Sequence, residues 1–397
     1  MSATETRPPQ IGIDASSVVG LRTGIGHATA ELLSALGDCW PGDWPPARVW
    51  VNSPRHELPS EDSWLASPAF QVRRTRLPGR ALLRGWQYLH WPPAEMLLGP
   101  VDLVHAPASY IMPVRAARRV VTVHDIYFKY APQHVEPYGG GYFAQTFERG
   151  LERVEHVIAV SEFTREELLK FYPLDPHRIS VVPNAVDPRR FNPEPLAEDP
   201  AIIKGLGVAP PYLLCVATIE PRKNLITLIE AYARARQILR AGGQRLPRLV
   251  ITGQPGWGIK ALTARVSEAL LQDMVTVTGY LEDRLLPALY RQALGFVFPS
   301  IYEGFGMPVL EAMACGCPAA VAKAASLPEI AGDAAAYFNP RDSDSMARAL
   351  TRFVTDPHWR GDLREAGLRR AREFTWATTA RKTLEVYRQV MQQPPRF

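Results

Sequence analysis

Short, continuous apolar segments alternate with helical patterns through both halves of this chain. Because such segments are apolar along their whole length, both faces of the sheets they form must be covered by helices, which is typical of parallel sheets. The sequence therefore predicts an α/β fold with two doubly wound parallel-sheet domains. The predicted strands, six in each half, are Ile11–Asp14, Val49–Val51, Leu103–Ala106, Val120–His124, Val157–Ser161, Ile179–Pro183, Tyr212–Ala217, Leu249–Gly253, Val275–Gly279, Phe296–Pro299, Ala319–Ala322 and Ala335–Phe338.

The length of 397 residues fits two domains better than one. A loop rich in proline and charge, residues 187–210, is the expected boundary. We predict an N-terminal domain over residues 1–190 and a C-terminal domain over residues 191–375. The remaining residues, 376–397, contain an amphipathic helix over Trp376–Met391, which either closes the second domain or crosses back to the first.

The composition is that of a soluble globular protein, with 46% hydrophobic and 21% charged residues, and we expect a cytoplasmic location. No apolar run reaches the length of about 18 residues that a transmembrane helix needs. The polar N-terminus lacks the apolar core of a secretion signal. Cys39, Cys215, Cys315 and Cys317 have no metal-ligand spacing, so we expect no metal site and free thiols in a reducing compartment.

The net charge of +5 is unevenly distributed along the chain. Residues 1–195 hold 20 basic and 21 acidic side chains, whereas the rest of the chain holds 25 basic and 19 acidic ones. The positive excess favours a small phosphorylated ligand in the second half. Basic and aromatic residues are not interleaved as in a nucleic-acid-binding module, so we expect no nucleic-acid partner.

A glycine-rich turn joins the predicted strand ending at Pro299 to a predicted helix over Met307–Cys315. Gly304 and Gly306 permit unusual backbone angles and close approach to a ligand, and Pro308 suits the start of a helix. Free backbone N–H groups at such a turn bind phosphate. Glu303 and Glu311 lie at its two ends, where carboxylates are costly beside an anion unless they bind another part of the ligand, such as sugar hydroxyls. The structural alternative is a buried turn with two solvated or capping glutamates.

A second candidate anion site follows the first strand of the C-terminal half. Arg222 and Lys223 stand immediately before a predicted helix over Leu225–Leu239. Cations at a helix N-terminus oppose the helix dipole unless an anion lies between them. Arginine offers a two-pronged contact to phosphate and lysine a point charge, so we expect this pair to bind a diphosphate.

The N-terminal half carries candidates at the carboxyl ends of its strands, where this class of fold binds ligands. Gly24 and Gly26 form a glycine-rich turn before a predicted helix over His27–Leu36, and the turn either is purely structural or approaches a ligand closely. His124 and Asp125 end a predicted strand, and His105 ends the preceding one. Ser161 is expected to cap a helix, although its hydroxyl is also a candidate ligand contact.

The segment from Phe70 to Trp91 is the most basic stretch of the N-terminal half. Arg73, Arg74, Arg76, Arg80 and Arg84 are followed by three aromatic residues, with no acidic residue between Asp62 and Glu95. Such a partly helical segment is either a solvated basic face or a peripheral contact with an anionic membrane.

These motifs together resemble those of the retaining glycosyltransferases of family 4, which have the GT-B fold. The resemblance covers nearly the whole chain, and its motifs occur in the family's order. They are Thr-Gly-Ile-Gly at 23–26, Val-His-Asp at 123–125, Ala-Val-Ser-Glu at 159–162, Val-Pro-Asn at 182–184, Ile-Glu-Pro-Arg-Lys-Asn at 219–224 and Glu-Gly-Phe-Gly-Met-Pro-Val-Leu-Glu at 303–311.

The resemblance implies two Rossmann-like domains that face each other across a cleft, with a nucleotide-sugar donor held mainly by the second. It implies that Glu311 binds the ribose, that Glu303 contacts the donor sugar, and that Arg222 and Lys223 hold the diphosphate. His124 would contact the sugar from the first domain, and Gly24 and Gly26 would close over the phosphates. The C-terminal helix would cross back to the first domain. The backbone contacts to the diphosphate would come from Gly304, Phe305, Gly306, Met307, Pro308, Val309 and Leu310.

The family pattern implies hexosyl transfer with retention of anomeric configuration and no metal or other cofactor. GDP-mannose is the expected donor, because the 219–224 motif looks most like that of mannosyltransferases of bacterial surface-polysaccharide assembly. A glycan or lipid-linked glycan is the expected acceptor, and the inner face of the membrane a candidate location. Two alternatives remain open at this point, a non-catalytic sugar-nucleotide-binding partner of another transferase and a sugar-nucleotide epimerase with the same fold.

Overall fold

The computed structural model describes residues 7–20, 22–58, 62–109, 111–134 and 140–394. The chain divides into two compact units. The first comprises the residues up to Ala185 together with those from Thr375 onward, and the second runs from Val186 to Phe374. Among the described residues, no helix is both long and apolar enough to cross a lipid bilayer.

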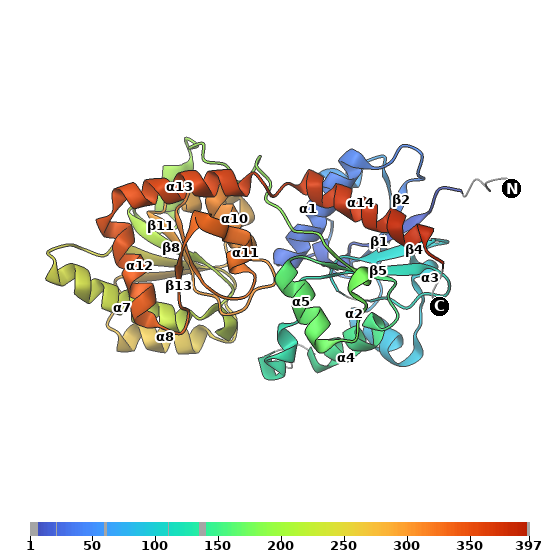
Figure 1. The fold of residues 1–397 in the computed structure, drawn as a ribbon, viewed down its shortest axis with the longest axis horizontal. Helices are drawn as coiled ribbons and strands as arrows, with labels where there is room; N and C mark the ends of the chain where they lie inside the picture. Colours follow the sequence, from blue (N-terminus) through green and yellow to red (C-terminus); the bar gives the residue numbers. More distant parts are fainter. Residues whose placement is uncertain (1–6, 21, 59–61, 110, 135–139, 395–397) are drawn as a thin grey trace. The chain divides into compact units, whose positions relative to one another are not determined.

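The first unit is built on a seven-stranded parallel sheet. Figure 1 shows α1 and α14 on one side of this sheet and α4 and α5 on the other. Its strands, in spatial order, are β3 (Phe70–Thr75), β2 (Ala47–Asn52), β1 (Ile11–Asp14), β4 (Leu103–Ala106), β5 (Arg118–Val123), β6 (His156–Ala159) and β7 (Ile179–Val181). Its helices are α1 (Gly24–Cys39), α2 (Gly79–Arg84), α3 (Ala94–Leu98), α4 (Gly140–Leu151), α5 (Glu162–Phe171) and α14 (Trp376–Gln392).

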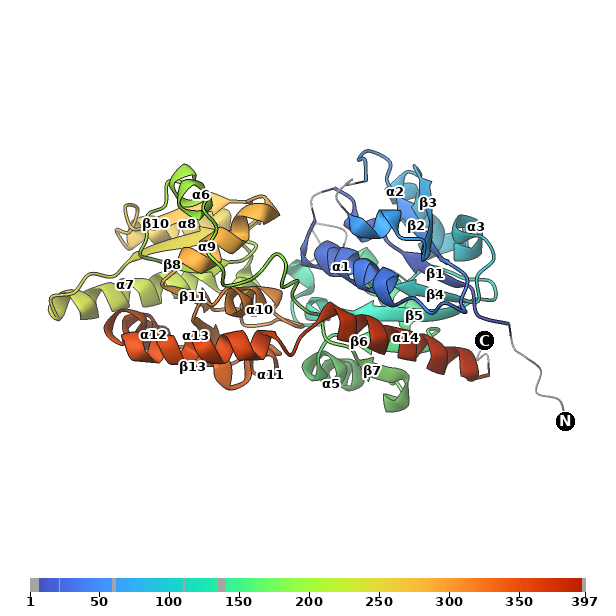
Figure 2. The ribbon, with the colours of Figure 1, turned by 90° about the horizontal axis from the view of Figure 1, so that it is seen from above.

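The second unit is built on a six-stranded parallel sheet. Figures 1 and 2 show α8 and α13 on opposite faces of it. Its strands, in spatial order, are β10 (Val275–Gly279), β9 (Arg248–Thr252), β8 (Tyr212–Val216), β11 (Gly295–Phe298), β12 (Ala319–Ala322) and β13 (Ala335–Phe338). Its helices are α6 (Asp199–Gly205), α7 (Leu225–Ala241), α8 (Ile259–Glu268), α9 (Leu286–Gln292), α10 (Met307–Ala314), α11 (Leu327–Ala331), α12 (Ser343–Thr355) and α13 (Pro357–Ala371).

The prediction of two doubly wound parallel sheets is confirmed. Every predicted strand is present, and the central strands β1, β4, β11 and β12 are buried at every residue, as continuous apolar runs require. In the second unit the chain passes outward from β8 in one direction and from β11 in the other. The adjacent carboxyl ends of β8 and β11 therefore form the switch point at which such sheets bind ligands.

Strand β3 is absent from the sequence prediction, which expects a partly helical basic segment there. In the described part of the chain β3 is an edge strand whose one neighbour is β2. Its exposed Gln71 and Arg73 alternate with the less exposed Phe70 and Val72. Polar and charged residues are common on edge strands because they oppose pairing with other chains. A search for continuous apolar runs cannot detect such a strand.

Helix α14 belongs to the first unit and packs against α1. The helix is amphipathic, as its sequence indicates. Its apolar face is buried, with Leu384, Tyr387 and Val390 at most 2% exposed. Near the end of the helix the guanidinium group of Arg118, at the start of β5, donates hydrogen bonds to the carbonyl oxygens of Met391 and Gln393. These bonds satisfy carbonyl groups that have no partner inside the helix.

Candidate functional site

The loops that follow β8 and β11 place two cations and a carboxylate together at the switch point of the second unit. Arg222 and Lys223 lie on a 3-10 turn between β8 and α7, and Glu303 lies between β11 and α10. Lys223 and Glu303 are 8% and 7% exposed. The structure therefore brings together two motifs that are 80 residues apart in the sequence.

Glu303 is the centre of this ion cluster. The Nζ atom of Lys223 lies 2.5 Å from Glu303 Oε1, and a terminal guanidinium nitrogen of Arg222 lies 3.1 Å from Glu303 Oε2. The Oγ atom of Ser300, which is fully buried, lies 2.5 Å from Glu303 Oε1. The Nε atom of Arg222 donates to a second carboxylate, that of Glu220, at 2.6 Å. Each cation is thus matched by a carboxylate in the structure.

Burial opposes ionisation of Glu303, but the charges of Lys223 and Arg222 outweigh it and hold the pKa of this carboxyl below its ordinary value. Glu303 is therefore ionised at neutral pH. Buried ion pairs of this kind are stable only when every charge keeps a partner. An anion that approaches Lys223 and Arg222 must share these cations with Glu303 or replace it.

Asn224, the last residue of the 219–224 motif, fixes the loop that carries both cations, a role that the sequence analysis did not assign to it. Its backbone is left-handed, with a φ of 56°, a conformation that asparagine tolerates better than most residues. Its side-chain amide donates to the carbonyl oxygens of Pro299, 3.1 Å away, and Pro340, 2.8 Å away. The loop after β8 is thereby bonded to the end of β11. The signals in the sequence were the place of Asn224 in the 219–224 motif and its position immediately before a helix.

The glycine turn has the strand–turn–helix form that the sequence predicts, with α10 beginning at Met307. Gly306 has a φ of 100°, and a Cβ atom there would lie 2.7 Å from Leu327 Cδ2. The backbone angle disfavours any other residue at this position, and a side chain there would also displace Leu327. The buried hydroxyl of Ser326, also missed by sequence reasoning, lies 2.9 Å from the Glu303 carbonyl oxygen and 3.0 Å from that of Phe305.

The side chains of the turn and of α10 serve mainly the core. Phe305, Val309 and Leu310 are at most 4% exposed, and Phe305 packs edge-on against Phe374. Any contact from these three residues to a ligand must therefore come from their backbone.

Glu311 is half-buried on α10, one turn inside the helix. Its Oε2 atom accepts a hydrogen bond of 2.9 Å from the hydroxyl of Tyr290, a fully buried residue of α9. Burial and the negative charge of Glu311 both raise the pKa of Tyr290, so the phenol remains a proton donor. This bond fixes the orientation of the carboxylate, and Tyr290 is a supporting residue that the sequence did not reveal.

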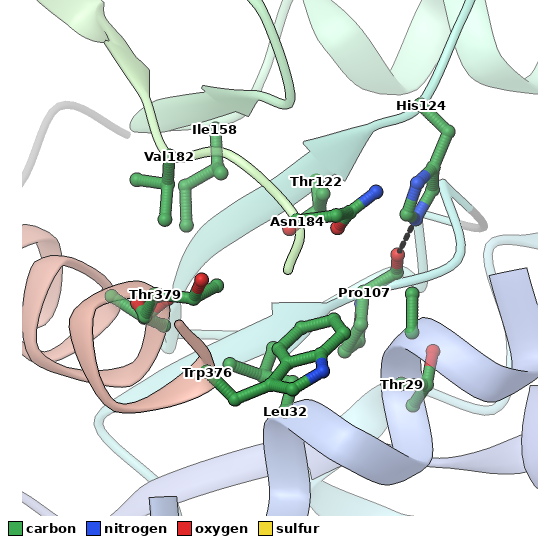
Figure 3. A pocket seen from close by; sticks show the side chains of 12 residues that line it. Thr29, Leu32, Pro107, Thr122, His124, Ile158, Val182, Asn184, Trp376 and Thr379 are labelled. Atoms are coloured by element: carbon green, nitrogen blue, oxygen red, sulfur yellow. Dashed lines mark hydrogen bonds between the residues drawn. The ribbon is translucent and has the colours of Figure 1, made fainter. Parts of the chain in front are cut away.

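In the first unit, His124 follows β5 and borders a small pocket (Figure 3). Thr29 on α1 and Trp376 and Thr379 on α14 also line this pocket. The Nε2 atom of His124 lies 2.8 Å from the carbonyl oxygen of Pro107, so it carries the proton and leaves Nδ1 as an acceptor. Burial lowers the pKa of His124, which keeps the ring neutral at physiological pH.

His105 does not have the accessibility that a ligand contact requires. It is 0% exposed, with Nδ1 2.7 Å from the Tyr387 hydroxyl and Nε2 2.8 Å from Thr122 Oγ1. Burial lowers its pKa to about 3. The prediction of a sugar or acceptor contact for His105 is therefore replaced by a structural role, in which it joins the sheet to α14.

Ser161 and Asp125 both make local backbone contacts. The Ser161 hydroxyl accepts a hydrogen bond from the Thr164 N–H at the start of α5, and the Ser161 side chain is fully buried. This is the capping role that the sequence predicts. Asp125 Oδ1 accepts a hydrogen bond from the Tyr127 N–H at 3.0 Å.

Gly24 and Gly26 lie in the first turn of α1, because this helix begins three residues earlier than the sequence suggests. Neither has a positive φ, and their surroundings differ. A Cβ atom at Gly26 would lie 2.5 Å from the carbonyl oxygen of Ser17, so close packing of the chain requires glycine there. Gly24 is exposed, and a Cβ atom there would meet nothing within 4 Å.

Two family models match the chain and together cover most of both units. Residues 47–190 match the model of glycosyltransferase family 4, and residues 201–371 match that of glycosyl transferases group 1.

Known proteins are similar to the chain over most of its length. Over 287 residues, 72% of this chain and 74% of the relative, it is 30% identical to the O-antigen chain mannosyltransferase B of Escherichia coli. It is also 30% identical to the alpha-maltose-1-phosphate synthase of Mycobacterium tuberculosis, over 68% of this chain and 73% of that protein. Sucrose-phosphate synthase from Thermosynechococcus elongatus has the same fold, with a TM-score of 0.75 at 20% identity over 96% of this chain and 99% of that one. The two family models and the relatives at 30% identity show that this chain belongs to glycosyltransferase family 4 and has the GT-B fold.

Proposed function

We propose that this chain is a retaining hexosyltransferase that moves a mannosyl group from GDP-mannose to a glycan or lipid-linked glycan acceptor. The relative named as an O-antigen chain mannosyltransferase supports mannose as the sugar and surface-polysaccharide assembly as the process. The relative named as a maltose-1-phosphate synthase has the same sequence identity to this chain, 30%, as the mannosyltransferase. A structural neighbour, HepE of Anabaena, is described in complex with UDP-glucose, so UDP-sugars and, with them, dTDP-sugars are the alternative donors to test.

The observation that carries the proposal is the buried cluster of Arg222, Lys223 and Glu303 at the switch point of the second sheet. A nucleotide-sugar diphosphate needs fixed cations beside a helix start, and Arg222 and Lys223 provide them just before α7. We assign both residues to the diphosphate.

Glu303, released in part from its cations when the diphosphate binds, would accept hydrogen bonds from hydroxyl groups of the donor sugar. Glu311, oriented by Tyr290, would accept them from the ribose hydroxyls. The backbone from Gly304 to Leu310 would contact the phosphates, which is consistent with the buried side chains of that segment.

In the first unit we assign the acceptor atom Nδ1 of His124 to a hydroxyl of the transferred sugar. The N-terminal turn of α1, with Gly24 and Gly26, would approach the phosphates. Asp125 remains a candidate contact for sugar or acceptor.

The reaction would break the bond between the anomeric carbon and the diphosphate oxygen and form a bond from that carbon to the acceptor oxygen. Attack would occur on the face that the diphosphate leaves, and the acceptor proton would pass to the leaving phosphate oxygen. Arg222, Lys223 and the start of α7 would stabilise the negative charge that grows on the leaving group, in place of a metal ion.

The decisive experiment incubates the purified chain with GDP-mannose and, separately, with UDP- and dTDP-sugars, after a thermal-shift screen that ranks their binding. Turnover of GDP-mannose with an acceptor glycan, and an NMR spectrum that shows the α configuration kept, are the expected results. Undiminished turnover in the presence of a chelator is expected if the cations alone stabilise the leaving group. Donor conversion that needs no acceptor would indicate an epimerase, and an inverted product would exclude the retaining mechanism.

A cytoplasmic location with peripheral contact to an anionic membrane is the last part of the proposal. Within the predicted basic segment Arg73–Arg84, Arg74 and Arg76 form ion pairs with Glu57, so part of the charge of that segment is neutralised. Arg80 and Arg84 on α2 are exposed and would make the contact.

A further inference from the structure

A second pocket in the first unit lies at the amino ends of the strands, whereas His124 lies at their carboxyl ends. Arg119, which lines it, stands near the amino end of β5, whereas His124 follows the carboxyl end of the same strand. At roughly 3.3 Å per residue, about 16 Å of strand separates the two. The polar residues that line this pocket are Gln87, His90, Arg119, Thr146, Arg149, Glu152 and Arg153.

The charge of this pocket is predominantly positive. Arg119, Arg149 and Arg153 contribute three guanidinium groups against one carboxylate, that of Glu152. In the part of the chain that the structure describes, no ion pair joins these three arginines to a carboxylate. One terminal nitrogen of Arg119 donates to the backbone carbonyl of Arg153, and the charge of Arg153 is close enough to lower the pKa of Arg119. Such an arrangement favours an anion.

Three buried polar atoms of the pocket lack a hydrogen-bond partner. They are Nε of Arg119, Oγ1 of Thr146 and Oε1 of Gln87. Burial lowers the pKa of Arg119, the charge of Glu155 partly offsets this, and that of Arg153 adds to it. Unpaired buried polar groups are costly and are normally satisfied by a ligand, an ion or water. Two of these atoms are hydrogen-bond donors, as binding of a phosphate oxygen requires.

Three exposed apolar residues are neighbours in the sequence of two residues that line the pocket. Gln87 and His90 belong to the segment that also carries Tyr88 and Leu89, which are 70% and 73% exposed, and Trp91, which is 54% exposed. The segment includes a π-helical turn, Gly85–Leu89, and it is held in place by Trp86, whose indole N–H donates to the Pro92 carbonyl at 3.0 Å. Exposed aromatic and aliphatic side chains near basic residues are typical of surfaces that bind an amphiphilic partner such as a lipid.

We propose that this pocket binds the phosphate of an anionic phospholipid in a bilayer, while Tyr88, Leu89 and Trp91 enter the membrane interface. Arginine forks recognise phosphate oxygens with two parallel hydrogen bonds, and three arginines exceed the single charge of a phosphodiester. The exposed Tyr88 and Leu89, next in sequence to Gln87 of the pocket, favour a lipid phosphate over a soluble one, because a soluble anion makes no contact with a membrane interface. The site is separate from the nucleotide-sugar site and does not depend on the assigned donor.

Vesicle co-sedimentation tests the charged part of the proposal. The wild-type chain is mixed with vesicles of phosphatidylcholine alone and with vesicles that also contain phosphatidylglycerol. The double variant Arg149→Ala/Arg153→Ala removes two exposed arginines, each worth about 1 kcal/mol near an anionic surface, so affinity should fall by roughly tenfold or more. The control Arg369→Ala/Arg372→Ala removes two exposed arginines from the second unit and should leave vesicle affinity nearly unchanged.

A second variant and a soluble probe test the lipid part. Tyr88→Ser/Leu89→Ser should weaken binding to phosphatidylglycerol vesicles with no loss of melting temperature, because both side chains are exposed. Inorganic phosphate should stabilise the wild-type chain weakly, and Arg149→Ala/Arg153→Ala should reduce that stabilisation, leaving the part that Arg222 and Lys223 contribute. The proposal is overturned if the wild type ignores phosphatidylglycerol vesicles, or if the pocket variant binds them as tightly as the control does. Phosphate stabilisation that Arg149→Ala/Arg153→Ala reduces, without vesicle binding by the wild type, would identify a soluble phosphate as the ligand and refute the lipid.

Discussion

Lys223 and Glu303 form a buried ion pair with 2.5 Å between Nζ and Oε1, although 80 residues separate them in the sequence. The pair links the loop after β8 to the loop after β11, and Arg222 binds the other carboxylate oxygen. A donor diphosphate would compete with Glu303 for both cations. Glu303 would then be free to bind sugar hydroxyls only when the phosphates are in place, which couples sugar recognition to diphosphate binding.

Replacement of Lys223 by alanine should lower kcat about 100- to 1,000-fold, because one preorganised cation that stabilises the leaving group is lost. It should also reduce the free energy of unfolding by about 3–5 kcal/mol, since Glu303 keeps a buried charge with one partner fewer. Steady-state kinetics and urea unfolding measure the two effects. The exposed Lys204→Ala serves as the matched control, and near-wild-type turnover by the folded Lys223→Ala variant would contradict the assignment.

The ion pair should also make stability depend on pH. The pKa of Glu303 is lower in the folded chain than its ordinary value of 4.5, so the unfolded chain binds more protons between the two values. The stability that the ionised carboxylate contributes is therefore complete above pH 4.5 and is lost as the pH falls through the folded pKa. Urea unfolding should show that wild type exceeds Glu303→Gln at neutral pH and that the difference shrinks below pH 4.5. A difference that stays constant with pH would show that Glu303 is not ionised in the folded chain.

Replacement of Glu311 by alanine should raise the KM for the donor by roughly tenfold or more and change kcat little, because hydrogen bonds to ribose contribute equally to substrate and transition state. Tyr290→Phe keeps the carboxylate but removes the bond that orients it, so the increase should be smaller. Initial-rate kinetics at varied donor concentration measure the KM and kcat of both variants. An unchanged KM in Glu311→Ala would remove the ribose assignment.

The sequence predicts the buried strands well and the edge strand poorly. Buried strands such as β1 and β11 were predictable because continuous apolar runs between turn residues have few other solutions. The edge strand β3 was not, because alternating arginines resemble a polar segment until β2 is present to pair with them.

The site shows the same division. Glu303, Arg222 and Lys223 stood out by their local motifs, but nothing local indicated that they neutralise one another. Ser300 and Tyr290 escaped notice because their roles exist only through contacts with Glu303 and Glu311, made across the fold. His105 was singled out by its place at the end of a strand, and only the packing of α14 shows why it is buried.

The contact between His105 and Tyr387 should be a structural one. Tyr387→Phe removes the hydrogen bond to the buried imidazole and should reduce the free energy of unfolding by about 1–3 kcal/mol. Turnover of the donor by the folded variant should be close to that of the wild type. Urea unfolding and kinetics at saturating donor check both statements. A large loss of kcat in His105→Asn or Tyr387→Phe without loss of stability would restore a ligand contact for His105.

Gly24 and Gly26 provide a test that separates a structural glycine from a functional one within a single helical turn. Gly26→Ala should destabilise the fold, because its Cβ atom would lie 2.5 Å from the Ser17 carbonyl oxygen. Gly24→Ala should leave stability unchanged or raise it by up to about 1 kcal/mol, because position 24 is helical, exposed and open. If the start of α1 approaches the donor phosphates, Gly24→Ala should nevertheless raise the donor KM, since only the ligand would meet the added methyl group. Thermal unfolding together with donor titration decides the matter, and a Gly24→Ala variant with wild-type kinetics would show that no ligand contacts this turn closely.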